Sequence, residues 1–164
     1  MKTRIAIFLG VISLVYGFSS CASTAKTKPG LSDKPFEYIY AFDDFSKDSL
    51  FKKSKLWIAN TYNSAEKVIT FDDLDSGVIK GNGVTKIPSH SMLAPFILKY
   101  SLAIDVKDGK TRLVINNFSG FTSEYETLHW NLLEYQVYYD DIKNYCDGLA
   151  ANYSQFMKQD TQDW

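Results

Sequence analysis

The chain has 164 residues, of which 18 are Lys or Arg, 19 are Asp or Glu and two are His, so its net charge at pH 7 is −1. This balance argues against a polyanionic partner such as nucleic acid or an acidic membrane surface. Hydrophobic residues make up 45% of the chain and aromatic residues 15%. That content is enough to bury the core of a single domain.

The first twenty residues have the pattern of a secretory signal peptide. Lys2 and Arg4 are positive, residues 5–18 carry no charge, and two serines follow before Cys21. The uncharged run is shorter than the about 20 apolar residues that span a bilayer. We therefore expect residues 1–20 to be a signal peptide that is removed on export.

The sequence Phe18-Ser19-Ser20-Cys21 resembles the lipobox of bacterial lipoprotein precursors, in which the cysteine thiol accepts diacylglycerol. Phe18 departs from that pattern, because an aliphatic residue is usual three positions before the cysteine. Cleavage by ordinary signal peptidase near Ser20-Cys21-Ala22 is the alternative. Lipidation of Cys21 predicts a membrane anchor, which needs at least two acyl chains to be stable. The expected location is the cell envelope, at the periplasmic face of the outer membrane, since Ala22 and Ser23 do not resemble an inner-membrane retention signal.

The lipidated cysteine is followed by a tether, and residues 21–35 form the predicted anchor and tether together. This stretch has two prolines and no apolar periodicity, which is typical of a flexible linker. Residues 36–158 are expected to form the domain, and residues 159–164 a C-terminal tail. Cys146 is the only cysteine besides Cys21, so the domain is held by its core and not by an intrachain disulfide.

The domain is predicted to begin with a strand and a helix. Residues 36–42 alternate so that four aromatic side chains share one face, namely Phe36, Tyr38, Tyr40 and Phe42. Ser46 is the expected N-cap of a helix that runs to about Tyr62. Its inward stripe is predicted to contain Leu50, Phe51, Ser54, Trp57, Ile58 and Thr61. The rest of its surface is interpreted as solvated and carries Lys52, Lys53 and Lys55.

Two antiparallel hairpins are predicted after this helix. Residues 68–72 and 78–86 are joined by the turn Asp73-Leu74-Asp75-Ser76-Gly77. Gly81 and Gly83 predict a bulge or a close backbone approach within the second strand. The next hairpin pairs residues 98–107 with residues 111–118 through Asp108-Gly109.

The chain is predicted to end in a long helix. This helix covers about residues 134–158 and contains Cys146, which is interpreted as a buried structural thiol. Residues 119–134 have no clear period, although their aromatic side chains indicate packing. The predicted order of elements is therefore β-α-β-β-β-β-α.

That order resembles the family catalogued as domain of unknown function 4468, which has a TATA-binding-protein-like (TBP-like) fold. The resemblance rests on SKDSLFKKSKLWIANTY for the first helix, VITFDDLDSGVIKGNG for the first hairpin and LAIDVKDGKTRLVINNF for the second. It implies an α+β fold in which a curved antiparallel sheet has two helices packed on one face. It implies no established activity and no catalytic residues.

The sequence contains no recognisable catalytic or metal-binding motif. His90 and His129 lie far apart, and neither an HExxH nor a GxSxG pattern occurs. Asp72, Asp73 and Asp75 lack the spacing and the final glutamate of a calcium loop, and are interpreted as turn residues. We therefore expect no catalytic residue, no metal site and no cofactor.

A nucleic-acid partner is also not expected. A minor-groove binder needs a basic sheet face with apolar wedges, whereas Lys99, Asp105 and Lys107 alternate here with Ser101 and Ala103. The expected envelope location also separates the protein from DNA.

The solvent-facing side of the predicted sheet is the remaining candidate for binding. It carries Lys80, Lys99, Ser101, Asp105, Lys107 and Arg112. Polar groups with neighbouring aromatic residues are suited to contact with a protein or a glycan.

Three functional hypotheses follow from the sequence. The first is a non-catalytic, membrane-tethered binding or assembly module whose partner is another envelope protein or a cell-wall component. The second is an envelope hydrolase with a pocket that groups His90 or His129 with two carboxylates. The third is a homo-oligomeric structural lipoprotein that pairs through an edge strand.

Overall fold

The computed structural model describes residues 34–62, 65–88, 96–121 and 136–159. The predicted signal peptide, Cys21, His90, His129 and most of the ambiguous segment 119–134 lie outside these residues. The elements in chain order are β1 (Phe36–Ala41), α1 (Lys47–Thr61), α2 (Ala65–Val68), β2 (Ile69–Asp73), β3 (Val78–Ile87), β4 (Phe96–Lys107), β5 (Lys110–Phe121) and α3 (Gln136–Lys158).

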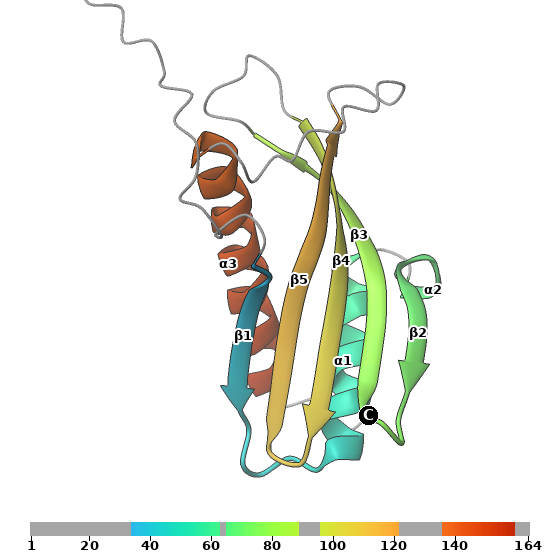
Figure 1. The fold of residues 1–164 in the computed structure, drawn as a ribbon. Coiled ribbons are helices and arrows are strands. Elements are labelled where there is room, and N and C mark those ends of the chain that lie inside the picture. Colours follow the sequence, from blue (N-terminus) through green and yellow to red (C-terminus); the bar gives the residue numbers. More distant parts are fainter. Residues whose placement is uncertain (1–33, 63–64, 89–95, 122–135, 160–164) are drawn as a thin grey trace, which may run out of the picture.

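The five strands form one antiparallel sheet in the order β1-β5-β4-β3-β2. The strands twist strongly, and α1 and α3 lie together on one face of the sheet (Figure 1). The predicted α+β fold is thus confirmed. The prediction omitted α2, in which Val68 ends a short helix instead of beginning β2. Four residues are too few to show a helical period in a sequence.

The core lies between the sheet and the two helices. Leu98, Tyr100, Leu102, Ile104 and Val106 of β4 are all buried, as their alternation predicts. The aromatic side chains of Phe36, Tyr38, Tyr40 and Phe42 also face the helices. The hydroxyls of Tyr38 and Tyr40 donate hydrogen bonds to α3.

The start of α1 is fixed by two contacts. The Ser46 hydroxyl accepts a hydrogen bond from the Ser49 amide at 3.3 Å, which confirms the predicted N-cap. The Lys47 amide donates to the Asp108 carboxylate at 2.7 Å, so the β4–β5 turn caps the helix as well. Gly109 follows at φ +69°, a conformation that favours glycine.

Two predictions about α1 are wrong. Lys53 is not solvated but only 5% exposed, because the end of α3 packs over it. Its Nζ donates to the Gln159 carbonyl and lies 5.0 Å from the centre of the Phe45 ring. Thr61, which the helical period predicts in the inward stripe, is exposed. It lies in the last turn of α1 and lines an open groove.

The two glycines of β3 are places of close approach, as predicted. A Cβ at Gly83 would lie 2.2 Å from Cζ of Tyr100, and one at Gly81 would lie 2.5 Å from the carbonyl oxygen of Val68. The register of β2 against β3 shifts between Ile69 and Phe71, which is a bulge opposite Gly81. These glycines let the Tyr100 ring and the end of α2 pack directly on the strand.

Candidate functional site

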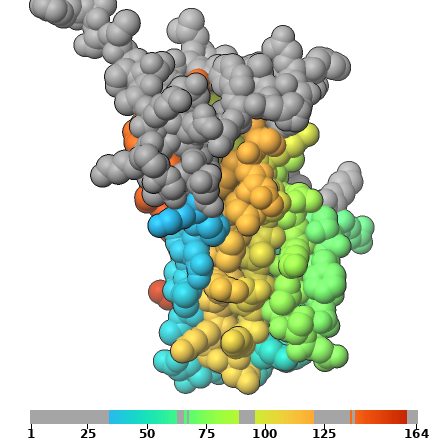
Figure 2. All heavy atoms as spheres, in the orientation of Figure 1, coloured from blue at the N-terminus to red at the C-terminus, as the bar shows by residue number. Residues whose placement is uncertain are grey.

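The face of the sheet that points away from α1 and α3 is called the open face here. No described helix covers it, and the strands form the visible surface side by side (Figures 1 and 2). The register pairs Asp105 with Arg112, and Lys80 with Ala103, on this face. All six side chains that the sequence proposed for binding lie here, namely Lys80, Lys99, Ser101, Asp105, Lys107 and Arg112.

The open face is more positive than the chain as a whole. By the strand register it carries the basic residues Lys80, Lys86, Lys99, Lys107, Lys110 and Arg112, and the acidic residues Glu37, Asp73 and Asp105. Arg112 forms ion pairs with two of these acidic residues. Its Nη2 lies 2.6 Å from the Asp105 carboxylate, and its Nη1 lies 3.8 Å from the Glu37 carboxylate. The hydrogen bond to Asp105 raises the pKa of Arg112. The net positive charge of the open face therefore comes mainly from its lysines.

A row of neutral polar groups crosses the middle of the open face. The Ser101 hydroxyl donates to Asn82 at 3.2 Å and accepts from the Asn117 amide at 3.3 Å. Asn117 has φ +54° at the point where the register of β4 and β5 shifts. This bulge turns the Asn117 side chain toward Ser101, and it extends the set of polar residues that the sequence predicted.

Three large apolar side chains are exposed on the open face. Ile39 is 67% exposed, Phe71 is 49% exposed and Val84 is 58% exposed. Lys80 Nζ lies 5.9 Å from the centre of the Phe71 ring. Exposed apolar groups among polar and charged side chains are a feature of protein-binding surfaces.

The described residues contain no group of three His, Cys, Asp or Glu side chains that could hold a metal ion. The Asp73 carboxylate accepts hydrogen bonds from the amides of Asp75 and Ser76 at 3.1 Å each. Hydrogen bonds from the Ser76 side chain and from the two amides lower the pKa of Asp73, and these bonds account for Asp73 as a turn residue. Asp72 is paired with Lys55 of α1. The hydrolase hypothesis depends on His90 and His129, which lie outside the described residues.

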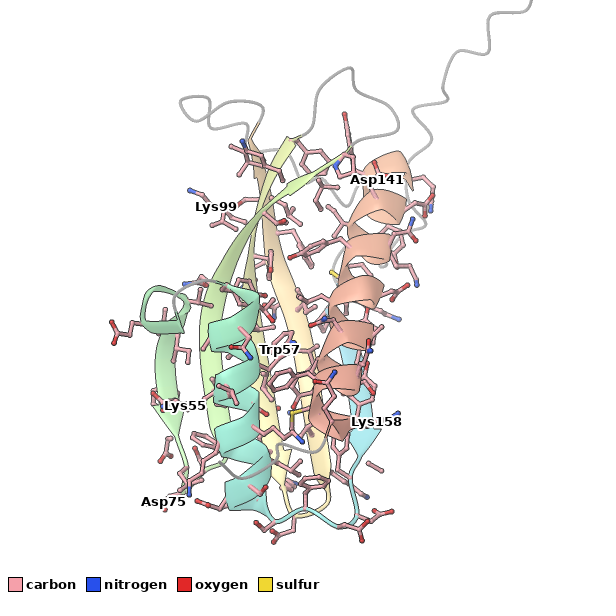
Figure 3. All side chains as sticks on the ribbon, turned by 180° about the vertical axis from the view of Figure 1, so that it is seen from behind. Lys55, Trp57, Asp75, Lys99, Asp141 and Lys158 are labelled. Carbon is pink, nitrogen blue, oxygen red and sulfur yellow. The ribbon has the colours of Figure 1, made fainter. Side chains whose placement is uncertain are left out.

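A groove between α1 and α3 was not predicted. It has a volume of about 530 Å³ and is lined by Trp57, Asn60, Thr61, Asn144, Tyr145, Gly148, Leu149, Asn152 and Phe156. Trp57 points from α1 into the space between the helices (Figure 3), and its Nε1 donates to the Asn152 carbonyl oxygen at 2.8 Å. No local sequence pattern predicts the Trp57–Asn152 hydrogen bond, because the two residues are 95 positions apart in the sequence.

Three tyrosine hydroxyls meet beneath one end of the groove. The Tyr100 hydroxyl lies 2.8 Å from that of Tyr62 and 2.7 Å from that of Tyr145. Burial raises the pKa of all three groups. Cys146 is fully buried nearby, and burial raises the pKa of its thiol to about 12. A neutral buried thiol fits the predicted structural role.

Residues 36–120 match the family described as a domain of unknown function (DUF4468) with a TBP-like fold. The chain belongs to this family. A crystal structure of a DUF4468 family protein from Bacteroides ovatus is similar, with a TM-score of 0.60 and 11% identity over 79% of this chain and 89% of that one. A TBP-like protein from Parabacteroides distasonis gives a TM-score of 0.64 and 10% identity over 76% and 92%. No curated protein matches the chain.

In this DUF4468 protein the family match ends before α3. That helix nevertheless supplies buried core residues and one wall of the groove, so it is part of the same folded unit. Within the described residues, no helix is long and apolar enough to span a membrane.

Proposed function

We propose that this DUF4468 protein is a non-catalytic binding or assembly module of the cell envelope, tethered through a lipid on Cys21. Its partner is another envelope protein or a cell-wall component, and its location is the periplasmic face of the outer membrane. The signal-like residues 1–20 and the lipobox-like sequence around Cys21 support the tether.

The observation that carries the proposed binding role is the open face. Its lysines surround a polar row, and Ile39, Phe71 and Val84 remain exposed among them. A folded domain gains no stability from exposed aliphatic groups, whereas an interface gains when they are covered. The positive charge favours a partner with an acidic surface.

The binding role is tested by crosslinking in intact cells. A photo-crosslinking residue at Val84 samples the open face, and one at Leu56 of α1, which is 45% exposed, is the matched control on the helix side. We expect a defined crosslinked product from Val84 only, and its loss when Lys80 and Lys107 are changed to glutamate. Equal products from both positions, or none from Val84, would refute the proposed surface.

The tether is tested separately by fractionation. Cys21→Ser is expected to move the protein from membranes to soluble fractions. Cys146→Ala is the control, because that thiol is buried in α3 and carries no predicted lipid. Membrane association that survives Cys21→Ser would contradict the anchor.

A specific observation also favours the homo-oligomer as a second candidate. β2 pairs only with residues 78–81 of β3, so residues 82–87 have no partner strand on that side among the described residues. Such an edge can pair with a second copy. Val84→Pro would remove a backbone donor from this edge. A dimer in light scattering that Val84→Pro dissociates would support self-pairing, and a monomer at all concentrations would exclude it.

A further inference from the structure

The contacts between α1 and α3 change along the groove. Near one end the helices are joined directly, by the hydroxyls of Ser54 and Tyr153 at 2.9 Å and by Trp57 and Asn152 at 2.8 Å. At the other end Tyr62 and Tyr145 do not bond to each other. Each instead reaches the Tyr100 hydroxyl, which rises from the sheet between them. The direct contacts between the two helices are thus replaced, toward Tyr62 and Tyr145, by contacts through Tyr100 of β4.

The lining of the groove is uncharged and combines apolar side chains with side-chain amides. None of its residues is Asp, Glu, Lys, Arg or His. The amides of Asn60, Asn144 and Asn152 are exposed along its rim, and the Phe156 ring is half-buried. Amide groups both donate and accept hydrogen bonds, as sugar hydroxyls do. The chemistry therefore suits a neutral, hydroxyl-rich ligand better than an ion.

The Asn152 amide is held in one orientation. Its carbonyl oxygen accepts the hydrogen bond from Trp57 Nε1, and Trp57 is only 1% exposed. An amide fixed in this way presents its N–H₂ group at the groove, and it loses little freedom when a ligand accepts that bond. The site is thus organised before a ligand arrives.

Gly148 leaves the middle of the groove open. It lies four residues from both Asn144 and Asn152, about one helical turn from each. A Cβ at Gly148 would meet no atom within 4 Å, unlike one at Gly81 or Gly83. A glycine inside a helix is unfavourable compared with alanine. No internal contact requires it here, and its effect is to leave the backbone of α3 accessible between two amides.

We propose that this groove binds a short neutral oligosaccharide. Its volume of about 530 Å³ lies within the range of about 300–1,000 Å³ that is typical of small-ligand sites. The partly exposed rings of Tyr145 and Phe156 contact the apolar faces of the sugar rings, and the rim amides bind hydroxyl groups. A helical or extended peptide fits less well, since peptides are usually recognised through deep apolar pockets or an open strand edge.

The test is titration of the chain lacking residues 1–20 with uncharged trimers of glucose, mannose and N-acetylglucosamine. Side-chain amide signals in NMR spectra report the contact. We expect saturable shifts of the Asn60, Asn144 and Asn152 signals with at least one trimer. Gly148→Gln, which fills the open space, and Asn144→Ala should each weaken binding at least tenfold.

The control variant is Asn82→Ala, which removes an exposed amide on the open face and should leave sugar binding unchanged. Unfolding midpoints of all variants separate loss of binding from loss of fold. Three outcomes would overturn the inference: no trimer binds, only charged sugars or an acetylated tri-alanine peptide bind, or Gly148→Gln folds and binds normally. Because the two surfaces lie on opposite sides of the sheet, crosslinking at Val84 remains an independent test of the proposed function.

Discussion

The same strands form both faces of the sheet, but one face packs against the helices and the other is open. In β4, Leu102 and Ile104 are buried against the helices, while their neighbours Ser101, Ala103 and Asp105 face outward and are only half-buried. The covered face holds the aromatic core, and the open face holds lysines around a polar row. Side chains alternate between the two faces of a strand. A substitution on the covered face is therefore expected to change stability, whereas one on the open face can change binding with little effect on stability.

The largest contrast is expected when one aliphatic side chain is shortened on each face. Leu102→Ala should lower the free energy of unfolding by about 2–5 kcal/mol, since it leaves a cavity in the core. Val84→Ala, at a position 58% exposed, should change it by about 0.5 kcal/mol or less. Urea denaturation measures both. Similar losses from both variants would mean that the open face is also packed.

Alkaline pH should destabilise the covered face selectively. Burial raises the pKa of Tyr100 and of Tyr153, so both keep their protons in the folded state. In the unfolded chain they ionise near pH 10, so their contribution is intact below about pH 9 and is lost as pH rises. By pH 11 Tyr100 alone should cost about 1.4 kcal/mol, and Tyr153 should add to this loss.

This pH dependence is measured by urea denaturation at pH 8 and pH 11. Tyr100→Phe should flatten it, because one titrating group is removed. If ultraviolet absorbance showed every tyrosine of the folded protein ionising near pH 10, the expected linkage would be absent.

Two adjacent lysines of α1 give a sharper comparison. Lys53→Ala should cost about 1.5–3 kcal/mol, because Lys53 is buried and donates from a charged group to the Gln159 carbonyl. Lys52→Ala should cost about 0.5 kcal/mol or less, since its pair with Asp48 is exposed to solvent. Thermal unfolding of the two variants is the measurement. Equal midpoints would show that the contacts of Lys53 add nothing to stability.

Two glycines should respond to alanine with opposite signs. Gly83→Ala should cost about 1–3 kcal/mol, because the new methyl group meets the Tyr100 ring. Gly148→Ala should stabilise the protein by about 0.5–1 kcal/mol, because its Cβ meets nothing and alanine favours the helix. Calorimetry detects both shifts. A loss of stability at Gly148 would mean that an internal contact explains that glycine after all.

Much of the fold was predictable because its signals are local. The alternation of β4, the Ser46 cap and the Gly77 and Gly109 turns each depend on a few adjacent residues, and each is as the sequence indicates. The sequence also identified the polar residues of the open face, since alternation alone assigns them to the side away from the core. The short helix α2 was missed because four residues are too few to show a helical hydrophobic period.

The sequence by itself thus determined which side chains lie on each face of a strand, where α1 begins and which glycines lie in turns. Only the tertiary structure decided what those side chains meet. Lys53 is buried because the end of α3 reaches it, and Arg112 forms ion pairs because the register brings Glu37 and Asp105 to it. The groove exists because residues of α1 and α3, far apart in the sequence, are brought side by side. Such contacts join residues far apart in the chain, so no local pattern encodes them.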